Sequence, residues 1–153
     1  MRCKLYDLYQ KYDTLILINS KNREVMKKNK FVAYEGDNFT IEWYFDKNDK
    51  SAALEYYNEL PSRQQSKLKN LFFIFANTGK MRNEEKFRYE GDQIYAFKPT
   101  PDRFLCFFYQ GGKVIVTNAY EKKTDKMPVR EKDRALKAKA DYIKRCKEEN
   151  YYD

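Results

Sequence analysis

Aromatic and β-branched residues gather in short runs that predict the strands of a sheet. Phe39–Phe45 is the first run, and Lys86–Tyr89 and Gln93–Lys98 follow later in the chain. Arg103–Tyr109 and Lys113–Tyr120 are joined by a Gly-Gly turn, which is typical of a hairpin. The runs therefore predict an antiparallel sheet whose last two strands are direct neighbours.

Between the first run and the others, the apolar positions change to helical spacing. Ala52–Leu60 predicts a short helix, with Asp49 or Ser51 as its N-cap, and Pro61 ends it. A second helix is expected to follow immediately, up to Gly79 as its C-cap.

The second helix is expected to begin at Ser62, which forms the pattern of a capping box with Gln65. Its apolar stripe is typical of a helix face packed on a core. The stripe consists of Leu68, Leu71, Phe72 and Phe75.

A last helix is expected after Pro128, since proline is favoured in the first turn of a helix. Its apolar positions recur at helical spacing, and cations lie on its outer face. The apolar positions are Ala135, Ala138, Tyr142 and Cys146. The whole order predicts a compact α+β domain with its helices on one face of the sheet.

The first 30 residues differ from the rest. Met26–Lys30 resembles a translation start inside the chain, so residues 1–25 are either an upstream extension or a basic arm. No apolar run reaches the roughly 18 residues of a membrane span. Leu15–Ile18 is too short for the core of a signal peptide, so a cytoplasmic protein is expected.

The positive charge is concentrated at the two ends of the chain. The 153 residues include 31 Lys and Arg against 23 Asp and Glu, a net charge of +8. Residues 1–30 carry +5, residues 31–120 carry zero and residues 121–153 carry +3. Either a solvated surface or nucleic-acid binding fits this balance. Because residues 31–120 carry no net charge, a few specifically positioned cations must make any contacts with nucleic acid.

The residue types exclude several chemistries. The chain has no His, so a structural zinc site and imidazole general-base catalysis are not expected, and no cofactor is predicted. Cys3, Cys106 and Cys146 lie far apart, and reduced thiols are expected, with Cys106 in the core. Any catalysis must use Lys, Arg, Tyr, Asp or Glu.

Several motifs together resemble the RelE/ParE toxin superfamily, in particular its phage-derived, HigB-like branch. They are Gly91–Tyr95, Lys98, the hairpin strands, and above all the segment Lys122–Glu131, which contains a Lys-Lys-Thr-x-Lys-x-Pro pattern. The resemblance covers residues 37–146 and implies a RelE-like toxin domain over residues 31–148. Residues 149–153 are expected as a tail.

The resemblance implies the toxin of a type II toxin–antitoxin pair. Such a toxin is a metal-independent endoribonuclease that cuts mRNA on the ribosome and is blocked by a small helix-turn-helix antitoxin. Lys98 and Arg103 would stabilise the phosphate, and Tyr95 or a lysine would move protons. The residues expected to hold RNA are Lys122, Lys123, Thr124, Lys126 and Arg130.

The chain departs from the family pattern at one important place. Leu105 stands where the family has a phosphate-binding Arg, and Arg103, two residues earlier on the same strand face, is the expected substitute. Lys98 also replaces an Arg, which keeps the charge but loses the bidentate fork. Each of these cations is alternatively a solvated surface charge, and Tyr95 is alternatively a core aromatic.

Two other functions stay open. A non-catalytic member of the same fold that only binds RNA or an antitoxin would also fit, and Leu105 favours it. A gyrase-directed toxin, as the ParE side of the superfamily implies, is the third reading.

Overall fold

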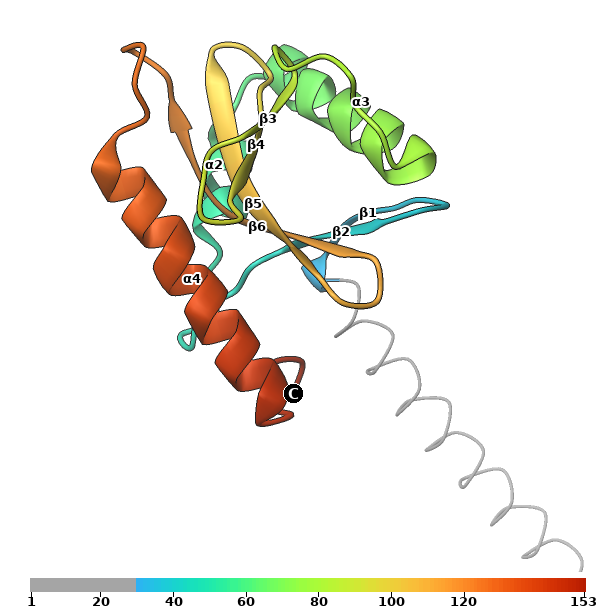
Figure 1. The fold of residues 1–153 in the computed structure, drawn as a ribbon, viewed down its shortest axis with the longest axis vertical. Helices are drawn as coiled ribbons and strands as arrows, with labels where there is room; N and C mark the ends of the chain where they lie inside the picture. Colours follow the sequence, from blue (N-terminus) through green and yellow to red (C-terminus); the bar gives the residue numbers. More distant parts are fainter. Residues whose placement is uncertain (1–29) are drawn as a thin grey trace, which may run out of the picture. The chain divides into compact units, whose positions relative to one another are not determined.

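The computed structural model describes residues 30–153, so the expected N-terminal extension lies outside the described part except for Lys30. The helices and strands follow the predicted order (Figure 1). The elements are β1 (Val32–Glu35), β2 (Thr40–Trp43), α2 (Ala52–Glu59), α3 (Ser62–Thr78), β3 (Phe87–Tyr89), β4 (Tyr95–Phe97), β5 (Asp102–Tyr109), β6 (Lys113–Glu121) and α4 (Val129–Lys147). The α+β architecture expected from the sequence is confirmed.

One six-stranded sheet has the strand order β1-β2-β6-β5-β4-β3. Its neighbours are antiparallel except β2 and β6, which are parallel, so the sheet is mixed. The strand β1 was not predicted. The predicted hairpin of β5 and β6 forms the centre of the sheet.

The helices cover both faces of the sheet, not one face as expected (Figure 1). Phe104 of β5 packs on Tyr56 of α2, whereas Phe107, three residues later, packs on Tyr142 of α4. Successive side chains of a strand point to opposite faces, so α2 and α4 lie on opposite sides. The first face also receives α3, since Phe72 contacts Phe97 of β4.

The predicted caps are confirmed at two of three places. Ser51 is the N-cap of α2 and accepts a hydrogen bond from the Leu54 amide at 3.3 Å. Gly79 ends α3 with φ of 67°, a left-handed conformation that glycine adopts at little cost. The expected capping box of α3 is wrong, because Pro61 is its N-cap and Gln65 instead donates to the Tyr57 carbonyl at 2.9 Å.

The last residues pack back onto the domain. Tyr151 is buried, and its hydroxyl accepts a hydrogen bond from the Phe45 amide at 2.8 Å. The Tyr152 hydroxyl donates to the buried carboxylate of Glu42 at 2.6 Å and lies 2.6 Å from the Tyr142 hydroxyl. These bonds fix the C-terminal end of α4 against β2.

Candidate functional site

Three strands place the candidate residues at one end of the sheet, on the face that α4 covers. Arg103 of β5 is the register partner of Tyr120 of β6. Phe97 of β4 pairs with Phe104, so Lys98, one residue beyond β4, comes opposite Arg103. Phe97 and Phe104 point to the face that α2 and α3 cover. Because side chains alternate along a strand, Lys98 and Arg103 point to the face that α4 covers.

Arg103 is a buried cation without a charged partner among residues 30–153. The residue is 8% exposed, and its one hydrogen bond in the described part goes to the Asp102 carbonyl, at 2.9 Å. The Asp102 carboxylate binds elsewhere, accepting from Tyr56 at 2.6 Å and Gln64 at 2.8 Å. Burying an unpaired charge is costly, so this guanidinium is suited to an anionic ligand.

Lys98 lies in a field of positive charge. Burial lowers its pKa, and the nearby charges of Arg103, Lys122 and Arg88 lower it further, against an opposing contribution from Glu90. The ammonium donates a hydrogen bond to the Glu84 carbonyl at 3.0 Å. A lysine in such surroundings gives up its proton more readily than an exposed lysine and attracts phosphate while it is charged.

Tyr120 is half-buried beside the same groups. Burial raises the pKa of its hydroxyl, Glu90 and Glu131 raise it further, and Arg103 opposes them. The hydroxyl therefore stays protonated at neutral pH and is available as a hydrogen-bond donor. The charges of Arg103 and Glu90 act on the Tyr120 hydroxyl, and both also act on Lys98.

Tyr95 is not brought together with Lys98 and Arg103. Its ring stacks on Phe87 at 5.5 Å and contacts Phe108 at 4.9 Å, and both of these rings contact Phe75 of α3. Lys98 directly follows β4 and is three residues after Tyr95, so along the extended chain their side chains point to opposite faces. Tyr120 is the tyrosine that lies on the same face of the sheet as Lys98 and Arg103.

The segment after β6 carries the residues expected to hold RNA. Lys122 is held at the end of the strand by its amide, which donates to the Pro101 carbonyl at 3.0 Å, and its charge acts on Lys98. The Thr124 hydroxyl donates to the Lys126 carbonyl at 3.0 Å and shapes the loop. Thr124, Lys126 and Lys123 are exposed.

Arg130 lies in the first turn of α4, with its side chain 85% exposed and 3.7 Å from the Glu131 carboxylate. Glu131 itself is buried and joins α4 to the sheet. It accepts a hydrogen bond from the Asn118 amide group at 2.9 Å, and its backbone carbonyl accepts another from that group at 3.1 Å. These bonds position the basic loop between β6 and α4.

Leu105 lies on the same face as Arg103 and is fully buried. Its register partners are Ala96 of β4 and Asn118 of β6. Leu105 is therefore a core side chain, whereas Arg103 lies two residues nearer the start of β5.

Three groups of the candidate site, Arg88, Glu90 and Tyr120, were not among the expected site residues. Arg88 belongs to β3 and Glu90 follows it, and the β3–β4 hairpin brings both beside Lys98. The position of Glu90 depends on the turn before β4, where its amide donates to the Ile94 carbonyl at 2.8 Å. Over residues 30–153, no three His, Cys, Asp or Glu side chains gather as a metal site would need. No helix of that part has the length and apolar character to cross a membrane.

A protein-family model matches the central part of the chain. Residues 55–140, more than half of the chain, match the family model described as phage derived protein Gp49-like (DUF891). The match runs from α2 into α4 and includes Lys98, Arg103, Tyr120 and the basic loop. No curated protein matches the chain. The protein belongs to the phage-derived Gp49-like family, a RelE/ParE-like family associated with toxin–antitoxin systems.

Proposed function

We propose that this protein is the toxin of a type II toxin–antitoxin system, a ribosome-associated endoribonuclease that cuts mRNA in the cytoplasm. The observation that carries the proposal is Arg103, a buried guanidinium with no carboxylate partner in residues 30–153, beside Lys98 and opposite Tyr120. Family membership supports it, since the family is associated with toxin–antitoxin systems.

The chemistry needs three groups. The ribose 2′-hydroxyl loses a proton and attacks the adjacent phosphorus, and the bond to the 5′-oxygen breaks. The products are a 2′,3′-cyclic phosphate and a 5′-hydroxyl. A base, a cation for the pentavalent phosphate and an acid for the leaving oxygen are therefore required.

The cluster offers a residue for each role. Arg103, with Lys122, stabilises the negative charge that develops on the phosphate. Glu90 accepts the proton of the 2′-hydroxyl. The leaving oxygen takes a proton from Lys98, whose pKa is lowered by burial and by Arg103, or from Tyr120, which remains protonated. In this assignment Tyr120 takes the place of Tyr95.

The exposed cations would hold the RNA strand and the ribosome. Lys123, Lys126 and Arg130 contact phosphates, and Thr124 keeps the loop in shape. A cognate helix-turn-helix antitoxin would block the protein by placing an acidic segment over the same cations.

The test is controlled expression in bacteria with growth, mRNA integrity and DNA damage followed together. Growth arrest with mRNA cut at codon positions supports the proposal. Unchanged growth and intact mRNA, with the protein shown to be folded, contradict it. DNA damage without mRNA cleavage would instead point to a gyrase-directed toxin.

A non-catalytic binder on the same fold is the second candidate. The fully buried Leu105 favours it, because one family cation is absent from the site. This candidate predicts RNA or antitoxin binding through Arg103 and the basic loop, with no cleavage of any RNA.

A further inference from the structure

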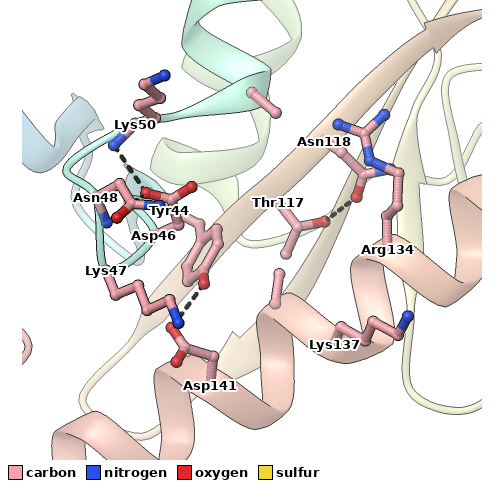
Figure 2. A pocket seen from close by; sticks show the side chains of 12 residues that line it. Tyr44, Asp46, Lys47, Asn48, Lys50, Thr117, Asn118, Arg134, Lys137 and Asp141 are labelled. Atoms are coloured by element: carbon pink, nitrogen blue, oxygen red, sulfur yellow. Dashed lines mark hydrogen bonds between the residues drawn. The ribbon is translucent and has the colours of Figure 1, made fainter.

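A pocket of about 580 Å³ opens between α4 and the loop that joins β2 to α2 (Figure 2). It lies on the face of the sheet that α4 covers, but it does not include Arg103 or Lys98. A volume of this size accommodates a nucleotide-sized ligand. Its cationic lining residues are Lys47, Lys50, Arg134 and Lys137.

The carboxylates of the pocket are already engaged. Asp46 accepts hydrogen bonds from the amides of Asn48 at 2.8 Å and Lys50 at 3.0 Å. Asp141 accepts from the Tyr44 hydroxyl at 2.6 Å and from Arg145 at 3.1 Å. These bonds hold the acidic groups in the wall of the pocket.

The lysines, in contrast, are available. Within the described residues, the ammonium groups of Lys47, Lys50 and Lys137 form no ion pair. Arg134 reaches Glu131 only at 3.5 Å. The lining carries four cations, of which Arg134 pairs with Glu131, against the carboxylates of Asp46 and Asp141, so an excess of positive charge remains.

The backbone that carries the cations is held by loop hydrogen bonds and by α4. The loop closes through hydrogen bonds from the Asp46 amide to the Lys50 carbonyl at 2.8 Å and from the Asp49 amide to the Asp46 carbonyl at 3.0 Å. Arg134 and Lys137 are three residues apart on α4 and project from neighbouring turns. The small side chain of Ala138 leaves the space between them and the sheet open. This is a concave site, which distinguishes it from scattered surface lysines.

We propose that this pocket binds the phosphate of a nucleotide. Such a phosphate belongs either to one residue of an RNA strand or to a free mononucleotide. Asn118 lines the pocket and lies two residues before Tyr120 on β6, about 7 Å along the strand. An RNA strand whose scissile phosphate lies at Arg103 would place a neighbouring nucleotide in the pocket. That part rests on the proposed function.

The experiment measures binding rather than cleavage, with the full chain. The probes are 5′-AMP and a short 2′-O-methyl oligoribonucleotide, which cannot be cut, each titrated at several salt concentrations. The variants are the double substitution Lys47→Gln with Lys137→Gln, and Ala138→Leu. Lys144→Gln, an exposed position on α4 outside the pocket, is the matched control.

The double variant is expected to weaken binding about 10-fold and to reduce the slope of log affinity against log salt by about 0.7 for the oligonucleotide. Ala138→Leu fills the pocket without changing the charge and is expected to weaken binding similarly. Lys144→Gln is expected to stay within about two-fold of the parent. Thermal unfolding checks each fold, and if Ala138→Leu unfolds, the exposed Lys47 position keeps the test valid.

The two probes separate the sources of the phosphate. Effects on the oligonucleotide alone assign the pocket to an RNA strand, and effects on 5′-AMP alone assign it to a free nucleotide. The proposal would be overturned if the double variant and Lys144→Gln weakened binding equally while folded Ala138→Leu left binding unchanged. That result would assign the binding to general surface charge. Pocket binding without any RNA cleavage would contradict only the proposed function, whereas cleavage with unaffected pocket variants would contradict only the pocket.

Discussion

Arg103 of β5 and Tyr120 of β6 face each other in the register of the central hairpin, on the side of the sheet that α4 covers. The pairing sets a buried guanidinium beside a hydroxyl whose pKa is raised by burial and by Glu90. A fixed cation next to a protonated hydroxyl is an arrangement suited to a phosphate that gains negative charge.

Replacing Lys98 by Gln is expected to raise the midpoint of thermal unfolding at pH 7 by ~1 to 3 °C. The pKa of Lys98 is lowered in the folded protein by burial and by Arg103, Lys122 and Arg88, so charging it opposes folding. This cost is complete below the folded pKa and disappears as the pH rises toward the unfolded value. The gain in the variant should therefore shrink at alkaline pH.

The measurement is thermal unfolding of both proteins from pH 7 to pH 10, with Lys80→Gln as a control outside the cluster. A variant that is less stable at every pH would show that the hydrogen bond from Lys98 to the Glu84 carbonyl outweighs the repulsion.

Replacing Glu90 by Gln tests the proposed base. The rate of RNA cleavage is expected to fall by about 10²-fold or more. Binding of a non-cleavable RNA should persist, because the cations remain. An unchanged cleavage rate would show that another group accepts the proton.

Replacing Glu131 by Ala is expected to lower the free energy of unfolding by about 2 kcal/mol, because the Asn118 amide group would lose its buried acceptor. Glu131→Gln keeps an acceptor oxygen and should cost less. Urea unfolding of both variants measures the difference. Equal stability of the Ala variant and the parent would show that this bond does not anchor α4.

Replacing Leu105 by Arg puts a guanidinium at a fully buried position, where the resemblance to the RelE/ParE superfamily implies an arginine. We expect a loss of about 3 kcal/mol or more in the free energy of unfolding and no gain in RNA cleavage, because an unpaired charge would enter the core. Leu105→Met, which keeps the volume, should cost less than about 1.5 kcal/mol. A stable Leu105→Arg protein with faster cleavage would instead indicate an eroded site in the parent.

The elements that local patterns define were predictable from the sequence. The hairpin of β5 and β6 followed from alternation around a Gly-Gly turn, and α4 followed from apolar spacing after Pro128. The parallel pairing of β2 with β6 was not predictable in this way, because Ile41 and Val114 meet only through tertiary packing. The four residues of β1 are too few to show a period.

The sequence of β5 indicates that a helix must cover the second face of the sheet. Phe104, Leu105, Cys106 and Phe107 are consecutive and all fully buried, which requires cover on both faces of the strand. A helix on one face only would leave Leu105 and Phe107 in solvent.

The candidate site was predictable only in part. Lys98 and Arg103 meet because their strands are neighbours in a hairpin, and their charges interact as expected for neighbouring cations. Tyr95 was separated from them by the same alternation, since it is an odd number of residues from Lys98. Glu90 could not be recognised from spacing alone, because its position depends on how the turn before β4 folds back.

The rate of mRNA cleavage on ribosomes programmed with a defined message tests the central claim most directly. We predict that the parent protein produces new 5′-ends within the translated region. Arg103→Gln should lower that rate by about 10²-fold, while Arg82→Gln, an exposed arginine outside the cluster, should change it by less than about two-fold. Absence of cleavage by the folded parent protein, or cleavage by the Arg103→Gln variant at the parent rate, would contradict the account.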